Sequence, residues 1–488
     1  MSLQSLTQKQ SRLDSLPLHQ KSNSKKMAVE EVGYYHQTVD EKGKRKWLYP
    51  LIRKDFWYKN RSILSYILLT FLFAAPYIKV NGNQFLLFNI IERKFILFGQ
   101  VFWPQDFFIL VLITLTGLIG IILFTSAFGR IFCGWICPQT IFMEMVFRKI
   151  EVLIEGEPTT RKKLDNAPWT QDKIIKKTTK HVLYVLISFF IANTFLAYII
   201  GSDELFKIIT EPISSHLIGF LSIWVFTGAF YWVFSHVREL VCIVACPYGR
   251  LQGVLLDSNS LVVAYHYLRG EPRGRIKKNE ANATETGDCV DCNLCVAVCP
   301  TGIDIREGTQ LECVNCTACI DACNQVMDKV KKPRNLIGYY SENMIKNNVK
   351  QKFTFRMKAY SAIILLMISI SRYFILSRTD VDVTLLRAAG ALYQEQPNGY
   401  VSNLYTAEII NKTSKEAQIE LVPEDPSMKI TWIQKTDKMS RESSASATFF
   451  VLIPEKNISQ SNTKITLLVK QNGKTIQKLK TSFLGPLN

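Results

Sequence analysis

Five long apolar runs constrain this chain more than any other feature of its sequence. They are 18 to 22 residues long, and at 1.5 Å per residue each can cross a hydrocarbon core of about 30 Å. The runs cover residues 63–80, 107–128, 182–200, 213–234 and 359–376. A buried core helix is the alternative, and it applies most to the fifth run, where Arg372 must reach the membrane surface. We therefore predict an α-helical membrane bundle of about five spans.

The positive charge lies in alternate connections between these runs. The 488 residues carry 59 Lys and Arg against 41 Asp and Glu, a net charge of +18. Segments 1–62, 129–181 and 235–354 hold 13, 10 and 15 basic residues, whereas 81–106 holds two and 201–212 holds one. Basic loops face the cytoplasm, so we predict a cytoplasmic N-terminus and an external C-terminus. No basic face with interleaved aromatic residues is visible, so nucleic acid is not an expected partner.

Eight of the twelve cysteines have the spacing of a bacterial two-cluster ferredoxin. The two runs are Cys289-x2-Cys292-x2-Cys295-x3-Cys299-Pro300 and Cys313-x2-Cys316-x2-Cys319-x3-Cys323. Three cysteines of each run wrap around one [4Fe–4S] cluster, and the fourth reaches the other cluster. The predicted ligand sets are Cys289, Cys292, Cys295 and Cys323 for one cluster, and Cys313, Cys316, Cys319 and Cys299 for the other. Zinc sites usually have longer spacers, and disulfides are disfavoured in the cytoplasm, so neither alternative fits as well.

The other four cysteines form two identical Cys-x3-Cys-Pro motifs, each shortly after an apolar run. The motifs contain Cys133 and Cys137, then Cys242 and Cys246. A spacing of four puts both thiols of a motif on one helix face, so we expect four thiols to converge at the cytoplasmic membrane boundary. Soft thiolates bind Cu(I), zinc or iron–sulfur clusters, and they can also cycle between dithiol and disulfide. Four buried cysteines acting as small apolar residues are the plain alternative.

The rest of the chain completes a five-part organisation. Residues 378–488 lack cysteine and contain alternating runs such as Thr463–Lys470, followed by an Asn472-Gly473 turn, typical of a β-sandwich of about seven strands. The Asn81-Gly82-Asn83 sequence predicts a hairpin. The predicted segments are a cytoplasmic N-terminal segment (1–62), a membrane domain with four spans and both thiol motifs (63–246), a cytoplasmic ferredoxin domain (247–354), a fifth span (355–377) and the outer β-sandwich (378–488).

Four isolated side chains are weaker candidates for a functional role. His216 lies near the outer end of the fourth run, and His236 lies close to Cys242. Met143 and Met145 follow the first thiol motif. The functional interpretations are a copper or quinone contact for His216, a further ligand or proton donor for His236, and copper ligands for the methionines. Ordinary packing at the interface or in the core is the simpler interpretation.

Taken together, these motifs resemble the membrane-bound polyferredoxin family of cytochrome oxidase accessory proteins called CcoG, also known as FixG or RdxA. The matching residues are Pro104-Gln105-Asp106, Gly129-Arg130, Phe132-Cys133-Gly134-Trp135, Cys137-Pro138-Gln139-Thr140, Arg238-Glu239, Cys246-Pro247-Tyr248, Arg269–Gly274 and Thr301–Arg306. The chain departs from the family at His266, where Asp is usual, and at Gly249, where Ala is usual. Neither departure replaces a thiol.

The resemblance implies an oxidoreductase of the bacterial inner membrane that reduces Cu(II) to Cu(I) for the assembly of a cbb-type cytochrome c oxidase. It also implies that the outer sandwich is immunoglobulin-like and lies in the periplasm. Expected partners are the lipid bilayer, copper ions, a copper chaperone or transporter, cbb-type oxidase subunits and an unidentified electron donor. Cys133, Cys137, Cys242 and Cys246 are the candidate catalytic and metal-binding residues. A quinol-linked ferredoxin relay and a non-enzymatic assembly scaffold are the alternative functions.

Overall fold

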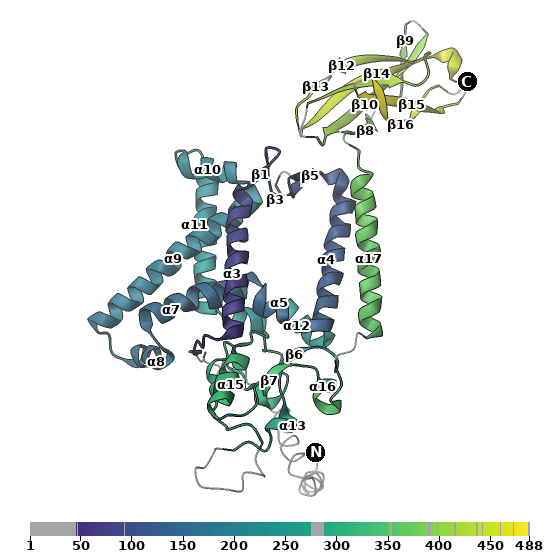
Figure 1. The fold of residues 1–488 in the computed structure, drawn as a ribbon. Coiled ribbons are helices and arrows are strands. Elements are labelled where there is room, and N and C mark those ends of the chain that lie inside the picture. Colours follow the sequence, from purple (N-terminus) through teal and green to yellow (C-terminus); the bar gives the residue numbers. More distant parts are fainter. Residues whose placement is uncertain are drawn as a thin grey trace, which may run out of the picture. The chain divides into compact units, whose positions relative to one another are not determined.

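The computed structural model of the chain forms two compact units, which are described here separately (Figure 1). It describes residues 45, 47–91, 93–274, 287–350, 354–379, 381–388, 392–397, 399–413, 416–435, 438–441, 443–458, 460–471 and 473–486. Unit 1 comprises residues up to Leu68, Ile122–Ser188 and Gly228–Met357. Unit 2 comprises Leu69–Ile121, Phe189–Thr227 and the chain from Lys358 onward. The predicted N-terminal segment lies almost entirely outside the described residues.

Four helices within the described ranges are long and apolar enough to cross a membrane. They are α4 (Phe107–Phe128), α9 (Gln171–Ile200), the continuous helix of α11 and η4 (Leu217–Val237), and α17 (Phe355–Leu376). The most apolar is α4, with a mean hydropathy of 2.9. Four of the five predicted runs therefore lie within or largely within such helices, as expected for a membrane protein.

The first predicted span, residues 63–80, is wrong in its bounds. Helix α3 covers Phe56–Ala74 and is followed by the short 3₁₀ helix η1 (Ala75–Tyr77). Pro76 cannot continue an α-helix, because its nitrogen carries no hydrogen and its ring clashes with the preceding turn. The helix instead extends toward the N-terminus through Lys59 and Arg61, and it is not among the four helices that are apolar enough over a membrane-spanning length.

Unit 1 contains the ferredoxin elements. Strand β6 (Val262–Tyr265) pairs antiparallel with β7 (Ile337–Tyr340). Helix α14 (Leu294–Ala297) contains Cys295, and helix α15 (Ala318–Lys329) contains Cys319 and Cys323. Buried Ile320, Met327 and Leu336 fill the core between them. The shorter helices of unit 1 are α5 (Ile131–Trp135), α6 (Pro138–Ile141), η3 (Phe142–Phe147), α7 (Arg148–Glu155), α8 (Pro158–Asn166), η5 (Val241–Ala245), α12 (Pro247–Leu255), α13 (Tyr267–Gly270), η7 (Ile305–Glu307) and α16 (Glu342–Asn347).

Unit 2 contains an antiparallel β-sandwich. One sheet has the order β12-β14-β10-β8 with β9 on β10, and the other has the order β13-β11-β15-β16. The strands are β8 (Val381–Arg387), β9 (Gln394–Gln396), β10 (Tyr400–Asn411), β11 (Ala417–Pro423), β12 (Lys429–Gln434), β13 (Lys438–Met439), β14 (Ser444–Pro454), β15 (Asn462–Gln471) and β16 (Lys474–Leu484). Tyr405, Phe449 and Phe483 are fully buried between the sheets. The sandwich has nine described strands rather than about seven. The two additional strands, β9 and β13, are only three and two residues long, too short to show an alternating pattern. The predicted turn includes Asn472, which lies outside the described residues.

The remaining elements of unit 2 are the loops at the ends of the long helices. The predicted hairpin is confirmed: β1 (Lys79–Val80) pairs with β2 (Asn83–Gln84), and Asn81 and Gly82 have φ of 54° and 87°. A left-handed conformation at both central residues is what a two-residue hairpin turn requires. The other elements here are β3 (Leu86–Asn89), β4 (Lys94–Leu97), β5 (Gln100–Phe102), η2 (Pro104–Asp106) and α10 (Ser202–Thr210).

Candidate iron–sulfur and thiol site

Four cysteines surround each of two cavities in the ferredoxin part of unit 1. The first cysteine cavity is lined by Cys289, Cys292, Cys295 and Cys323. The second cysteine cavity is lined by Cys299, Cys313, Cys316 and Cys319, and Cys295 of the first set also lines it. The last cysteine of each run thus lies with the first three cysteines of the other run, in the crossed grouping that the spacing predicts.

The donor set of these cavities suits an iron–sulfur cluster. Both are lined by thiols and mainly apolar side chains, including Val263 and Ile305 in the second and Val326 and Leu336 in the first. Burial, together with a smaller effect of its three cavity partners, raises the pKa of Cys323 to about 12. Thiols of this kind stay protonated until a cation binds them and replaces the protons. Each cavity therefore holds what a cubane cluster needs, a set of four soft ligands.

The two Cys-x3-Cys-Pro motifs adopt the same loop, and it is not the single helix face that we expected. Cys133 lies in α5, but this helix ends at Trp135, and Cys137 is extended with ψ of 122°. Cys246 follows η5 in the same way, with ψ of 111°. Each extended cysteine precedes a proline, which disfavours helical geometry in the residue before it. The expectation of two thiols on one continuous helix is therefore wrong for both motifs.

Matching hydrogen bonds show that the two loops are structural equivalents. The backbone N–H of Cys137 donates to the carbonyl of Phe132 at 2.9 Å, and that of Cys246 donates to Val241 at 2.8 Å. In each loop the bond spans five residues and the following proline starts a new helix, α6 or α12. Proline suits the first position of a helix, where no hydrogen-bond donor is needed.

The four thiols of these loops lie in each other's electrostatic range. Burial raises the pKa of Cys242 to about 12, and Cys137, Cys133 and Cys246 contribute to it. The Cys133 thiol donates to Gln252 Oε1 at 3.3 Å, and burial raises its pKa to about 11. Among the described residues, no three His, Cys, Asp or Glu side chains are grouped closely enough to hold a single metal ion. The structure thus brings the four thiols into one neighbourhood without closing them around one point.

Gly134, next to Cys133, lies directly against the loop of the second cysteine cavity. A Cβ at this position would be 2.5 Å from the carbonyl oxygen of Val314 and 2.8 Å from that of Asn315. Both residues lie between Cys313 and Cys316. Only glycine allows this approach, because any side chain would overlap the backbone. The thiol loops and the second cysteine cavity are therefore immediate neighbours.

Arg130 connects the same two parts of the site. Its guanidinium donates to the carbonyls of Leu311 and Gly249, which lie in the ferredoxin loop and in α12. It lies in electrostatic range of both Cys133 and Cys313, and its side chain is buried. Its hydrogen bonds fix α12, which follows Cys246, against the loop that leads into Cys313.

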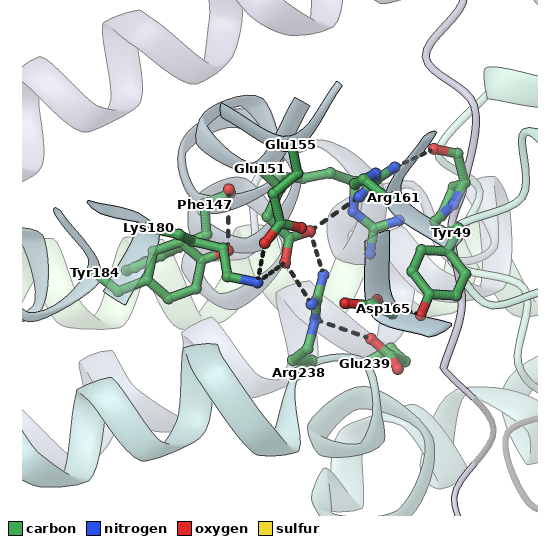
Figure 2. A network of polar contacts seen from close by, with 12 residues as sticks. Tyr49, Phe147, Glu151, Glu155, Arg161, Asp165, Lys180, Tyr184, Arg238 and Glu239 are labelled. Carbon is green, nitrogen blue, oxygen red and sulfur yellow. Dashed lines mark hydrogen bonds and ion pairs between the residues drawn. The ribbon is translucent and has the colours of Figure 1, made fainter. Parts of the chain in front are cut away.

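A buried ionic network joins the two segments of the chain that carry the thiol loops (Figure 2). Glu151 on α7 accepts from Arg238 and from Arg161, and Glu155 pairs with Lys180 at 2.8 Å. Arg238 lies four residues before Cys242. This network was not predicted from the sequence, in which Arg238 stood out only as part of a matching motif. Charged residues spaced by three and four on α7 are usually read as a solvated face, and only the structure shows that they are buried.

The weaker candidates have ordinary structural partners. His216 Nε2 lies 2.6 Å from Glu211, and the ring of His236 packs edge-on against Trp47 at 6.0 Å. Met143 and Met145 are both buried, 4% and 3% exposed. These contacts fit the simpler interpretation, packing at the interface or in the core.

Three family models match this chain. Residues 237–342 match a 4Fe-4S dicluster domain, and residues 372–486 match the IG-like fold at the C-terminus of FixG. Residues 110–155 match a 4Fe-4S binding domain, a segment that includes Cys133 and Cys137. The predicted iron–sulfur ferredoxin and immunoglobulin-like sandwich are confirmed as domain types.

Three relatives align with most of the chain. FixG of Rhizobium meliloti is 36% identical over 312 residues, which are 62% of this chain and 59% of FixG. RdxB of Cereibacter sphaeroides is 33% identical over 399 residues, 77% of this chain and 82% of RdxB. RdxA of the same organism is 33% identical over 349 residues, 70% of this chain and 73% of RdxA. The alignment thus spans most of RdxB and RdxA but less than two thirds of FixG.

The fold and the cysteine cavities define a membrane-bound iron–sulfur electron-transfer protein with an immunoglobulin-like C-terminal domain. Because it aligns with most of RdxB and RdxA, the chain belongs to the FixG/RdxA family of membrane polyferredoxins. The resemblance seen in the sequence is confirmed.

Proposed function

We propose that this protein reduces Cu(II) to Cu(I) at the four thiols of Cys133, Cys137, Cys242 and Cys246. One observation carries the proposal: the two thiol loops converge next to the second cysteine cavity, where Gly134 contacts the backbone between Cys313 and Cys316. A soft-ligand group beside an electron-transfer centre suits a metal ion that becomes softer on reduction.

Two [4Fe–4S] clusters, held by the cysteines of the first and second cysteine cavities, would supply single electrons at low potential. Each Cu(II) gains one electron and becomes Cu(I), and no covalent bond of the substrate is broken. The thiols lose their protons as they bind the ion, since thiolate and not thiol is the ligand. Thiolates favour Cu(I) over the harder Cu(II), so binding at this group also favours the reduced product.

The same proposal places the protein in the bacterial inner membrane, with the ferredoxin domain in the cytoplasm and the sandwich in the periplasm. The excess of basic residues in 129–181 and 235–354 supports this orientation. A copper chaperone or transporter and the subunits of a cbb-type oxidase are the proposed partners. Labelling of single cysteines or charged reporters from each side of intact membranes tests the orientation.

A single-turnover assay tests the copper chemistry. The full chain is purified anaerobically in detergent and reduced, the excess reductant is removed, and Cu(II) is added with a Cu(I)-specific chromogenic chelator. We expect Cu(I) to form as the iron–sulfur absorbance reoxidises, with one copper reduced per electron released. Ser at any one of the four thiol positions should slow this step at least tenfold and leave the iron and sulfide content unchanged.

The control and the rival functions give different results in this assay. Met143→Leu removes a buried thioether near the first loop and should leave the rate unchanged. Normal copper reduction with all four thiols replaced would reject the proposal. Rapid reduction of the clusters by a quinol, with no response to copper, would instead support the quinol-linked relay.

A further inference from the structure

Buried arginines surround the second cysteine cavity. Arg61 is 4% exposed and donates from Nε to the carbonyl of Gly134 at 2.7 Å, and it lines a space that also contains Cys316. Arg130 is 5% exposed and lines a space with Cys313. The hydrogen bonds of both guanidinium groups go to backbone carbonyls, which carry no charge to cancel theirs. Both positive charges therefore remain available to act on the cavity.

The carboxylates near the second cysteine cavity cancel this charge only in part. Glu144 lines the same space as Arg61, but it is paired with a third buried arginine, Arg148, at 3.2 Å. Glu312 lies in electrostatic range of Arg130. Three arginines and two glutamates thus lie around this cavity, and the balance is positive.

Around the first cysteine cavity, by contrast, the arginine in the lining is paired with carboxylates. Arg306 is the charged residue that lines it, and its guanidinium is bound by two carboxylates, Asp304 at 2.6 Å and Asp291 at 2.6 Å. Nearby, Arg269 and Lys332 pair with Asp288, and Arg273 pairs with Glu271, so these positive charges are also matched by carboxylates. In addition, Cys292 is exposed, whereas the four cysteines of the second cavity are partly buried.

We infer that Arg61 and Arg130 give the iron–sulfur centre of the second cysteine cavity the higher reduction potential, so that electrons enter at the first cavity and leave through the second toward the thiol loops. This inference rests on the proposed function for the destination of the electron. The two arginines act on the iron–sulfur centre through their positive charge, and they contact no substrate.

The sign follows from electrostatics. Reduction adds one negative charge to a centre, and a buried cation nearby stabilises the added charge. A cation that is already neutralised by carboxylates, such as Arg306, does so much less. Exposure of Cys292 to water also stabilises the reduced form of the first centre. Because water screens charge strongly, this effect is weak. The two buried arginines act through a medium of low polarity, where their effect is larger. The buried charges therefore decide the order, and exposure of Cys292 gives an external donor access to the first centre.

A redox titration of the full chain, monitored by electron paramagnetic resonance, tests the order. The protein is loaded with its clusters, purified anaerobically in detergent and poised at a series of potentials, without copper. Cys292→Ser and Cys316→Ser identify the two signals, because each variant alters or removes the signal of its own cavity. We expect the signal of the second cavity to appear at the higher potential, and Arg61→Gln and Arg130→Gln each to shift it to lower potential.

Two further variants separate a charge effect from a folding effect. Arg61→Lys keeps the positive charge and should keep most of the potential. Arg334→Gln removes an exposed arginine that pairs with Asp328, and it should move neither signal. A second-cavity signal at the lower potential, or one that neither glutamine variant shifts, would overturn the inference. Because no copper is present, failure of the copper assay would reject the proposed function and leave this order standing.

Discussion

Arg238 donates two hydrogen bonds to Glu151, of 2.7 and 2.9 Å, and thereby joins the segments of both thiol loops (Figure 2). Glu151 follows the first loop along α6, η3 and α7, and Arg238 precedes the second. Arg238 also has a φ of 55°, a conformation that costs a residue with a side chain of order 1 kcal/mol or more. The ion pair and the surrounding packing hold this backbone in place, so the pair positions Cys242.

Replacement of Glu151 by Gln should destabilise the protein strongly. The change leaves Arg238, which is 6% exposed, buried without its main counter-charge. Removal of one partner of a buried ion pair costs about 3–5 kcal/mol. Thermal unfolding in detergent measures the effect. Glu342→Gln breaks an exposed pair with Lys346 and should cost less than about 1 kcal/mol, and equal effects of the two variants would contradict the prediction.

The same pair predicts a loss of stability in acid. Burial by itself raises the pKa of Glu151, but Arg238 and its neighbours outweigh burial and lower the pKa from 4.5 to about 2. A carboxyl whose pKa is lowered on folding binds its proton more tightly when unfolded, so it stabilises the fold above pH 4.5. That stabilisation should disappear progressively between pH 4.5 and about 2. Unfolding followed across this range should show a weaker acid dependence for Glu151→Gln than for the wild type.

Gly134→Ala should separate the thiol loop from the second cysteine cavity. The added Cβ meets backbone atoms of Val314 and Asn315, which cannot rotate away as a side chain can. We expect slower reoxidation of the reduced clusters by Cu(II), by at least tenfold, with unchanged iron content. Gly120→Ala is the matched control, since a Cβ there meets nothing within 4 Å. An unchanged rate for Gly134→Ala would show that this contact does not carry the electron.

The grouping of the cysteines could be predicted from the sequence, whereas the contacts between the groups could not. Spacing predicts which cysteines share a cavity, because the loop of each run is short and local. It could not predict the contact between Gly134 and Val314, which joins positions 180 residues apart. The loop shape of the thiol motifs could have been predicted, since Pro138 and Pro247 already restrict the cysteines before them.

Long apolar helices were predictable for a similar reason, and the exception is instructive. A run such as α4 has no charged residue and no proline, so its predicted bounds of 107–128 match the structure. The predicted bounds of α3 were wrong because Pro76 ends the helix and Asp321 caps its N-terminus. Asp321 on α15 accepts the backbone N–H groups of Trp57 and Tyr58 at 3.1 and 2.7 Å. A helix start that is capped from another part of the chain leaves no local signal.

Copper binding at the thiol group should become tighter as the pH rises. Burial raises the pKa of Cys133 to about 11 and of Cys242 to about 12, so both are protonated at neutral pH before a metal binds. Each proton released on binding increases the apparent affinity about tenfold per pH unit. Competition with a Cu(I) chelator between pH 6.5 and 8 measures the slope. A slope of zero would mean that the thiols are not the ligands.

Asp106→Asn should loosen the junction between the sandwich and the loop before α4, within unit 2. Asp106 accepts from Arg378 at 2.6 Å and from Lys412 at 2.7 Å, and both Asp106 and the Lys412 side chain are almost fully buried. Loss of its charge leaves Lys412 with only a longer contact to Asp382, at 3.4 Å, so we expect a cost of about 3 kcal/mol. Hydrogen exchange followed by mass spectrometry should show faster exchange at the contacting ends of β8 and β10. Glu424→Gln, which removes an exposed pair with Lys478 on the same sandwich, should leave that exchange unchanged. Identical exchange profiles for the two variants would show that Asp106 does not hold this junction.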